Sequence, residues 1–277
     1  MTDIEFLKAA LIEDVADGDH SSLSTIPTDA TGKAHLLVKE DGILSGLEVA
    51  KLVFELVDPN IELDFFKNDG DSIKVGDIVF HATGNSQSLL KAERLMLNML
   101  QRMSGIATTT AIYVSKTAGT KAKVLDTRKT TPNLRTFEKT AVIHGGGHNH
   151  RFGLYDMIMI KDNHVDFAGG IKNALTKASE YVKNVKPGLK IEIETRDLNE
   201  VQQVLNVGLG DRIMLDNFNY ENTRKAVEMI GNTYETESSG GINLDTIAEY
   251  AKCGVDYISV GALTHSIKGL DLSFKAI

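Results

Sequence analysis

The stretch DTRKTTPNLRTFEKTAVIHGGGHNHRFGLYDMIMIKDNH, residues 126–164, decides how this chain is organised. Apolar residues at 124–125 precede it and a second apolar run at 157–160 closes it, so two strands are expected with a helix-like segment, 133–144, and a triple glycine between them. Fixed positive charges follow the two runs: Arg128, Lys129 and Lys161. A strand–helix–strand unit that ends in this way suits a multiply anionic small molecule.

Positive charge is concentrated in this part of an acidic chain. Residues 121–161 contain eight Lys or Arg against three acids, a local charge of +5, whereas the whole chain carries −8. Such a patch favours capture of an anionic small molecule and argues against nucleic acid, whose binders carry a basic balance over a whole face or domain. Four of the cations are expected to be solvated surface charges: Lys121, Lys123, Arg135 and Lys139.

Length and composition indicate an ordinary globular protein. The chain has 277 residues, 42% of them hydrophobic and 25% charged, which allows one large domain or two of moderate size. No run approaches about 18 uninterrupted apolar residues, and no basic region precedes an apolar run at the N-terminus, so neither a membrane span nor a signal peptide is expected. Cys253 is the only cysteine, which excludes an intrachain disulfide and a cysteine-rich metal site and favours the cytoplasm.

The first part of the chain predicts an α+β domain. An amphipathic helix opens the chain, strand-like pieces broken by turns follow from Gly32, and a helix is expected over 47–56. Residues 86–115 predict a mostly buried helix that ends or kinks near Gly105. Arg102 lies close to that glycine, and periodicity alone makes it a surface or helix-end charge.

Beyond residue 121, apolar runs and helix-like stretches alternate regularly. The runs are 122–126, 156–160, 190–193, 212–215, 234–238 and 257–260. This alternation implies parallel strands joined by right-handed crossovers. Six such strands indicate an α/β barrel more than an open sheet.

Nearly every run is followed by a charged residue or a glycine, and in a parallel barrel these ends share the rim that carries active sites. Three sectors result: a cationic one (Arg128, Lys129, His150, Arg151 and Lys161), an acidic one (Glu194 and Asp216), and a glycine-rich one (Ser239, Gly240, Gly241 and Gly261). The first suits carboxylates or pyrophosphate. The second suits ribose hydroxyls or Mg²⁺, held directly or through water. The third suits phosphate held by backbone N–H groups.

Each sector has a structural alternative. Glu194 and Asp216 fit ion pairs that neutralise the cations about as well as they fit a metal, and any one of the glycines is more often a tight turn than a phosphate site. His148 and His150 are spaced i, i+2, but no acid or cysteine lies beside them in sequence, so a metal site there is not favoured. The chain has no Ser–His–Asp order, HExxH, Walker loop or dinucleotide fingerprint, and the rim is therefore expected to work by electrostatics.

The motif DTRKTTP…LR…EK.AV…GGG.NHR.GLYDM..IKDNH closely resembles the nicotinate-nucleotide pyrophosphorylase (carboxylating) family, the decarboxylating quinolinate phosphoribosyltransferases. The likeness covers nearly the whole chain, from EDVADGDHSS through AERLMLNMLQRMSGIAT, IEIET, IMLDN and ESSGGINLDTI to DYISVGALTHS and LDLSFK. The departures are small: Asn133 stands where glycine is usual, and His148 occupies the variable position before Asn149.

This resemblance implies a fold and a reaction. The fold would be an N-terminal α/β sandwich domain at 1–112, to which 266–277 return, and an open TIM-like α/β barrel at 113–265. The reaction would transfer a phosphoribosyl group from phosphoribosyl pyrophosphate to quinolinate with Mg²⁺, giving nicotinate mononucleotide, pyrophosphate and CO₂ in NAD biosynthesis. The family works as a homodimer in which one subunit's N-terminal domain covers the other's barrel mouth; assembly beyond the dimer stays open.

The resemblance also implies residue roles, motif by motif. The quinolinate carboxylates would be held by Arg128, His150, Arg151 and Lys161, joined by Arg102 from the neighbouring subunit, which replaces its interpretation as a surface charge. Phosphoribosyl pyrophosphate would be held by Lys129, Glu194, Asp216, Ser239, Gly240, Gly241, Gly261 and His265. Lys129, Lys161, Glu194 and Asp216 would be catalytic, with Mg²⁺ on Glu194 and Asp216 directly or through water.

Two alternatives remain open. A paralogous protein associated with molybdenum transport shares the fold, although a looser match through GGG.NHR and KDNH would be expected of it. The stretch DGDSIKVGDIVF, residues 69–80, is similar to lipoyl or biotinyl domains and suggests a non-catalytic carrier or binding module. Against the carrier, no exposed lysine is expected at the hairpin tip, and the barrel would go unexplained.

Overall fold

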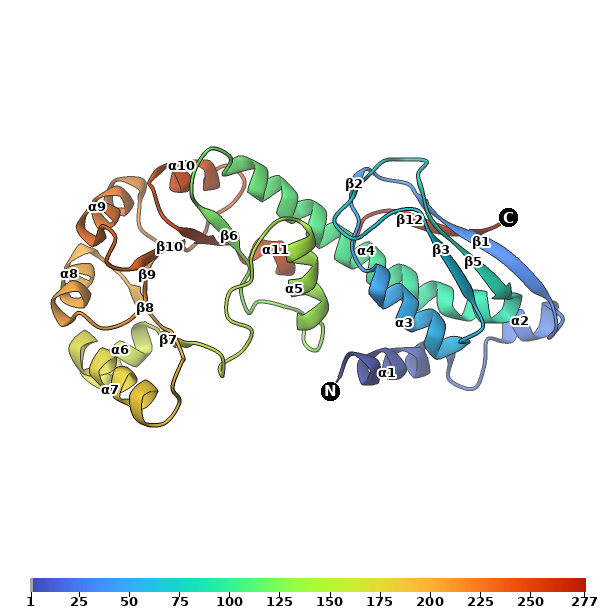
Figure 1. Cartoon of the computed structure of the whole chain (residues 1–277), viewed down its shortest axis with the longest axis horizontal. Helices are drawn as coiled ribbons and strands as arrows, with labels where there is room; N and C mark the ends of the chain where they lie inside the picture. The colour runs from blue at the N-terminus through green and yellow to red at the C-terminus, as the bar shows by residue number, and fades with distance from the viewer. Residues whose placement is uncertain (1) are drawn as a thin grey trace. The chain divides into compact units, whose positions relative to one another are not determined.

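The computed structural model describes residues 2–277, which divide into two compact units (Figure 1). Unit 1 comprises the chain up to Ala111 together with Thr130–Gly146 and Ser266–Ile277, and unit 2 comprises Ile112–Lys129 and Gly147–His265. Within residues 2–277, no helix combines the length and apolar character needed to span a bilayer. Each unit has its own sheet, and the two are described in turn.

An antiparallel sheet with the order β12-β1-β5-β3 forms the centre of unit 1. Its strands are β1 (Thr31–Val38), β3 (Glu62–Phe65), β5 (Ile78–Asn85) and β12 (Leu272–Ala276). Leu36 of β1 is fully buried and stands opposite Phe80 of β5 and Phe274 of β12. Because alternate side chains of a strand share one face, these residues form one apolar layer of the sheet.

Helices complete the core of unit 1, as the sequence predicts. They include α1 (Asp3–Val15), α2 (His20–Thr25) and α3 (Leu47–Val57), and a short ribbon pairs β2 (Gly42–Ile43) with β4 (Ser72–Ile73). The Phe54 ring of α3 lies 6.1 Å from the Phe80 ring and 6.0 Å from the Phe274 ring, centroid to centroid. These aromatic contacts fix the α3 helix against the apolar face of the sheet. The expected α+β architecture of this part is confirmed.

The long helix α4 (Ser86–Lys116) continues through the glycine at which the sequence predicts an end or a kink. The helix therefore does not end at Gly105, where a glycine instead allows the close approach of another segment. A Cβ at position 105 would lie 2.2 Å from the carbonyl oxygen of Lys268. The returning C-terminal segment is also tied to α4 by a hydrogen bond from the Leu270 N–H to the Gln101 carbonyl.

Residues 130–146, including α5 (Arg135–His144), pack in unit 1, whereas the predicted division assigns them to the barrel domain. The Phe137 ring lies 5.6 Å from the Phe6 ring, and the buried Glu138 pairs with Arg102. Lys139 is 1% exposed, so its interpretation as a solvated charge is wrong. An amphipathic helix buries the face that meets its neighbours, and the sequence of α5 does not say which neighbours those are.

The turn that follows β4 bears on the carrier alternative. Lys74 and Val75 are exposed there, and the Asp77 N–H donates to the Lys74 carbonyl oxygen at 3.0 Å. The expectation that no exposed lysine lies at this hairpin tip is therefore wrong. The carrier alternative has to be judged on the rest of the molecule.

Unit 2 is built on a parallel sheet with the order β6-β11-β10-β9-β8-β7. The strands are β6 (Lys123–Leu125), β7 (Ile158–Ile160), β8 (Ile191–Thr195), β9 (Arg212–Asp216), β10 (Glu235–Ser239) and β11 (Tyr257–Ser259). The six predicted runs are thus the six strands. Since β6 and β7 are the two ends of this order, the sheet curves without closing, which confirms an open TIM-like barrel.

Helices follow the strands and lie on the outer side of the curved sheet (Figure 1). They are α6 (Asp162–Ala168), α7 (Ile171–Asn184), α8 (Leu198–Val207), α9 (Tyr220–Ile230) and α10 (Ile247–Lys252). The short helix α11 (Ala262–His265) follows β11 and contributes to the lining of the cavity described below. Local capping sets several of their starts; the side chains of Asp197 and Asn219, for example, accept backbone N–H groups of α8 and α9. The carboxyl ends of all six strands are thereby left on one edge.

The inner face of this sheet carries charges in two layers. Neighbouring strands stand in parallel register, with Glu194 of β8 opposite Met214 of β9. Because every second residue of a strand points the same way, side chains at the strand ends and those two residues earlier share the inner face. We call Lys161, Glu194, Asp216 and Ser239 the rim layer, and His150, Glu192, Arg212 and Glu237 the buried layer.

Candidate active site

A cavity of about 750 Å³ lies at the carboxyl ends of the unit 2 strands. Every rim residue that the sequence predicts within unit 2 lines it: Arg128, Lys129, His150, Arg151, Lys161, Glu194, Asp216, Ser239, Gly240, Gly241, Gly261 and His265. The remaining lining residues are Thr127, Met159, Met214, Asn217, Ile242, Ser259 and Ala262. Side chains from six strands therefore meet around one space. A concave site with convergent polar groups is the usual form of a small-molecule site.

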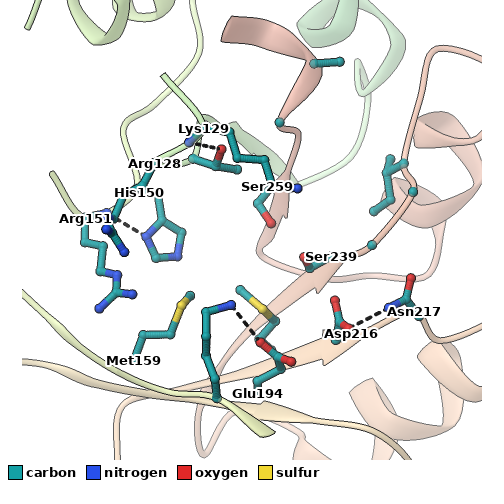
Figure 2. Close-up of a pocket in the computed structure, with 18 of the residues that line it drawn as sticks. Arg128, Lys129, His150, Arg151, Met159, Glu194, Asp216, Asn217, Ser239 and Ser259 are labelled. Atoms are coloured by element: carbon teal, nitrogen blue, oxygen red, sulfur yellow. Dashed lines mark hydrogen bonds and ion pairs between the residues drawn. The ribbon is translucent and has the colours of Figure 1, made fainter. Parts of the chain in front are cut away.

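The cationic sector occupies one side of this cavity. Figure 2 shows Arg128, Lys129 and Arg151 with His150 on one side, and Glu194 and Asp216 across from them. Burial, followed by the nearby Arg128, lowers the pKa of the Arg151 guanidinium. An anion bound between these two arginines would relieve both effects, since it compensates a desolvated and repelled positive charge.

The acidic sector is only partly neutralised by the protein. Nζ of Lys161 lies 3.2 Å from Oε2 of Glu194, and Oδ2 of Asp216 accepts a hydrogen bond from Asn217. Burial raises the pKa of Glu194; Lys161 opposes this shift, and Asp216 adds to it. The ion-pair alternative thus applies to Glu194 through Lys161. The repulsion between the two carboxyl groups also favours a cation close to both.

The donor set suits Mg²⁺. Both acidic residues line the cavity and offer carboxylate oxygens, the ligand type that this hard cation prefers. Glu194 and Asp216 come from the adjacent strands β8 and β9. These two residues would hold the ion, directly or through its waters.

The glycine-rich sector includes two positions with positive φ, Gly240 and Gly241. Gly240 has φ +95°, and a Cβ there would lie 2.2 Å from Oδ1 of Asn217. A Cβ at Gly261 would lie 3.1 Å from Cδ of Lys129 and from the His265 ring. Glycine in such places lets a ligand or a side chain approach the backbone closely. Both the tight-turn and the phosphate interpretations of these glycines therefore remain compatible with the geometry.

Lys129 is held in place by its own turn and by α11. Its backbone N–H donates to Oγ1 of Thr127, and its carbonyl accepts from Oγ1 of Thr264 at 2.9 Å. The turn after β6 is thus anchored at both its beginning and its end. Both hydrogen bonds involve the backbone of Lys129, and its side chain lines the cavity.

Arg102 is the predicted site residue that does not line this cavity. It belongs to unit 1, where its Nε donates to Oε1 of Glu138 at 2.9 Å and its Nη2 to Oγ1 of Thr131. Glu138 itself is fully buried. Arg102 is therefore fixed by a specific partner, in contrast to the free surface charge that periodicity suggests.

The buried layer contains the residues that sequence reasoning missed. Glu192 and Glu237 are 0% exposed, and their Oε2 atoms lie 3.0 Å and 3.5 Å from Nε2 of His150. Nη1 of Arg212 donates to Oε2 of Glu237 at 2.9 Å. Burial raises the pKa of Glu192 to about 7, and burial together with the nearby Glu192 raises the pKa of Glu237 to about 7.

A signal for this layer exists in the sequence. Glu192 precedes Glu194 by two residues, Arg212 precedes Asp216 by four, and Glu237 precedes Ser239 by two. Period-two spacing places each of them on the same strand face as a rim residue. The acid neighbours of His150 are therefore distant in sequence, which is why the absence of an adjacent acid was misleading for that histidine. His148 is exposed and does not join the group.

Comparisons with known proteins match both units. The family model for the quinolinate phosphoribosyl transferase C-terminal domain matches residues 106–275, and the model for the N-terminal domain of the same family matches residues 19–104. The chain is 45% identical to a chloroplastic nicotinate-nucleotide pyrophosphorylase [carboxylating] of Arabidopsis thaliana, over 97% of this chain and 81% of that protein. It is 40% identical to a probable nicotinate-nucleotide pyrophosphorylase [carboxylating] of Bacillus subtilis, over 97% and 91%.

A solved structure agrees with these sequence matches. The crystal structure of NadC from Streptococcus pyogenes superposes with a TM-score of 0.93 at 41% identity and covers 99% of this chain and 96% of that one. The likeness includes every segment that lines the cavity.

Proposed function

The chain belongs to the quinolinate phosphoribosyltransferase family, and from this premise we propose that it transfers the phosphoribosyl group of phosphoribosyl pyrophosphate to the ring nitrogen of quinolinate. The products are nicotinate mononucleotide, pyrophosphate and CO₂, in a step of NAD biosynthesis. The observation that carries this proposal is the single cavity in which cationic, acidic and glycine-rich sectors converge. Quinolinate supplies two carboxylates, and the cosubstrate supplies a sugar, a pyrophosphate and a 5′-phosphate.

The cationic sector holds the diacid. Arg128, Arg151 and Lys161 provide fixed positive charge around one part of the cavity, and guanidinium groups bind planar carboxylates through paired hydrogen bonds. This binding orients the pyridine nitrogen toward the sugar carbon, and such orientation is a large part of what a two-substrate reaction needs. His150 belongs to the same group by resemblance, and it lines the same cavity.

The other sectors hold phosphoribosyl pyrophosphate. Glu194 and Asp216 accept hydrogen bonds from the ribose hydroxyls and hold Mg²⁺, and Lys129 faces the pyrophosphate. The 5′-phosphate is held by the last sector: Ser239, Gly240, Gly241, Gly261 and His265. When held by Glu194 and Asp216, Mg²⁺ would neutralise part of the charge that builds up on the departing pyrophosphate.

The chemistry requires electrostatic groups and no nucleophile. As the bond to pyrophosphate breaks, the sugar carbon gains oxocarbenium character, which the carboxylates of Glu194 and Asp216 stabilise, while Lys129 and Lys161 stabilise the leaving charge. The ring nitrogen then bonds to the sugar and becomes a positively charged pyridinium. That charge accepts the electron pair left when CO₂ departs from the neighbouring ring carbon, and a proton from solvent completes the product.

Turnover of the purified protein tests this proposal. Quinolinate, phosphoribosyl pyrophosphate and Mg²⁺ should yield nicotinate mononucleotide and CO₂ in equal amounts. Nicotinate should be used at least about 100-fold less efficiently, because its missing carboxylate leaves cations of the cavity wall unpaired. Comparable turnover of nicotinate would contradict the assignment of the cationic sector. No turnover of quinolinate would favour the molybdenum-associated paralogue or a carrier.

We propose further that the enzyme is a homodimer in the cytoplasm, and that Arg102 of one subunit serves the cavity of the other. Arg102 lies in unit 1 and is absent from the lining of the cavity in unit 2, which supports a contribution from a partner. The single cysteine, Cys253, is buried and needs no oxidising compartment.

Hybrid dimers test the shared site. Arg102→Ala and Lys129→Ala subunits, each nearly inactive, are mixed and allowed to exchange. Half of the dimers are then hybrids with one intact site of two, so about a quarter of the wild-type activity should return. Exchange that is demonstrated by mass spectrometry without any recovery would contradict the shared site.

A further inference from the structure

The guanidinium of Arg102 is held by two side chains of the segment that contains α5. Its Nε and Nη2 donate to Oε1 of Glu138 at 2.9 Å and 2.5 Å, and Nη2 also donates to Oγ1 of Thr131 at 2.7 Å. All three residues belong to unit 1. Because these contacts converge on the Nε–Nη2 edge of a planar group, they define the orientation of the whole guanidinium.

The Nη1 end of the same guanidinium remains open. Nη1 carries two N–H groups, and no hydrogen bond from it is present within residues 2–277. The side chain of Arg102 is 30% exposed, whereas that of its partner Glu138 is 0% exposed. Nη1 is thus the part of Arg102 that is left for an oxyanion.

Glu138 is a fixed anchor for this arginine. It lies in the first turn of α5, where the N-terminus of a helix favours negative charge. Its Oε2 also accepts the backbone N–H of Thr131 at 3.2 Å. Glu138 forms part of the central motif of the sequence, in the EK pair, and the resemblance implies no role in the site for it.

We propose that Glu138 is a positioning residue, which fixes the Arg102 guanidinium so that Nη1 is presented to a carboxylate of quinolinate in the cavity of the partner subunit. Thr131 contributes to the same orientation. This inference rests on the proposed function and on the shared site.

A competing role for Glu138 concerns the cavity of its own chain. Thr131, whose N–H it accepts, follows Lys129 by two residues, so the carboxylate could support the turn that carries that lysine. The geometry favours Arg102, because both bonds from its guanidinium are shorter than the bond from the Thr131 N–H. The carbonyl of Lys129 is also held independently, by Thr264.

Two substitutions remove the anchor to different extents. Glu138→Gln keeps an oxygen that can accept from Nε and Nη2, whereas Glu138→Leu keeps the approximate size of the side chain and offers no acceptor. KM for quinolinate should rise about tenfold or more in Glu138→Leu and less than about threefold in Glu138→Gln, with kcat and KM for phosphoribosyl pyrophosphate nearly constant. An effect confined to kcat or to KM for phosphoribosyl pyrophosphate would overturn the inference.

The neighbouring threonines supply a milder variant and its matched control. Thr131→Val removes one acceptor of Arg102 at an exposed position and should raise KM for quinolinate about threefold, even if Glu138→Leu does not fold. Thr130→Val removes a hydroxyl that accepts from Arg135 instead, and it should leave this KM unchanged. Equal effects of the two valine variants would contradict the inference. Thermal unfolding of each variant checks that it is folded.

A double-mutant cycle tests whether Glu138 acts through Arg102. In the Arg102→Ala background, Glu138→Leu should raise KM for quinolinate by less than about twofold more, because the group that it positions is already lost. Losses that multiply independently would overturn the inference. This cycle does not depend on which subunit's cavity receives Arg102.

Hybrid dimers separate the two roles of Glu138. Glu138→Leu subunits mixed with Lys129→Ala subunits, at quinolinate concentrations well below KM, should regain about a quarter of the wild-type activity, because each hybrid has one complete site. The mixture with Arg102→Ala subunits should gain nothing over its parents, since neither site of that hybrid receives a well-placed Arg102. The reverse pattern would show that Glu138 serves the cavity of its own chain.

The premises of these experiments have their own controls. If Arg102→Ala and Lys129→Ala subunits exchange without recovery, the shared site is wrong, and the double-mutant cycle still decides whether Glu138 positions Arg102. Failure of wild-type turnover would count against the proposed function.

Discussion

The rim layer and the buried layer of unit 2 share the strands β8, β9 and β10 and both contain acidic and basic side chains, yet they differ in how those charges are matched. In the buried layer, Glu237 has Arg212 and His150 beside it, and Glu192 has His150. In the rim layer, Lys161 pairs with Glu194, whereas Asp216 has a neutral amide, Asn217, as its hydrogen-bonded neighbour. The negative charge of Asp216 is thus the rim charge that a bound cation or ligand would match.

Residues only two positions apart on one strand therefore have different purposes, one in the architecture and the other in the proposed function. Glu192 and Glu194 share one face of β8, but the first is enclosed by side chains and the second opens onto the cavity. Desolvated charges that are matched internally stiffen a structure, and charges that are left unmatched cost stability unless a ligand compensates them. Substitutions in the rim layer should therefore change activity, and substitutions in the buried layer should change stability and its pH dependence.

The largest effect is expected for Lys129→Ala on the cavity side. Loss of one charge that stabilises a departing group typically lowers the rate by about 10²–10³-fold, so kcat/KM should fall by that factor with little change in the unfolding temperature. Lys123→Ala is the matched control, because Lys123 is an exposed residue at the other end of β6. Equal losses of kcat/KM in the two variants would mean that a charge at the cavity matters no more than one at the opposite end of β6, and the proposed difference between the cavity side and the rest of the strand would be wrong.

A smaller effect is expected for Asp216→Asn. The substitution keeps the size of the side chain and removes one of the two carboxylates proposed for Mg²⁺, so the half-saturating Mg²⁺ concentration should rise about tenfold or more. Asp245→Asn, an exposed aspartate three residues after Ile242 of the cavity lining, serves as the control. An unchanged Mg²⁺ dependence in Asp216→Asn would remove this residue from the metal site.

How much of the fold and of the site could be predicted from the sequence depends on whether each feature is indicated by a local pattern or by contacts between distant segments. Period-two apolar runs and the residues after them are local patterns, so the six strands of unit 2 and nearly all the cavity residues are predictable. The burial of Lys139 and the uninterrupted helix at Gly105 depend on segments that return from elsewhere in the chain, α5 and residues 268–269. No local pattern encodes those contacts.

The buried layer lies between these two cases. Its residues on β8, β9 and β10 occupy predictable faces, but their pairing requires strands that are distant in sequence to stand in a known register, as those of Arg212 and Glu237 do. Asn133 offers a similar lesson at the backbone. Its φ of +66° explains why glycine is usual there, since that region suits glycine and asparagine best.

The smallest effect is expected for Glu237→Gln in the buried layer, measured as stability against pH. Burial and Glu192 raise the pKa of Glu237 in the folded protein from 4.5 to about 7. Between these two values the folded state holds more protons than the unfolded state, so the free energy of unfolding falls as the pH rises. Glutamine removes this titration, and the variant should gain stability relative to the wild type, by about 1–3 kcal/mol between pH 4.5 and 8. Thermal unfolding over this range measures the gain, with the exposed Glu221→Gln as a control that should stay parallel to the wild type. A stability difference between Glu237→Gln and the wild type that stays the same at every pH would show that Glu237 does not change its charge over this range, which contradicts the prediction.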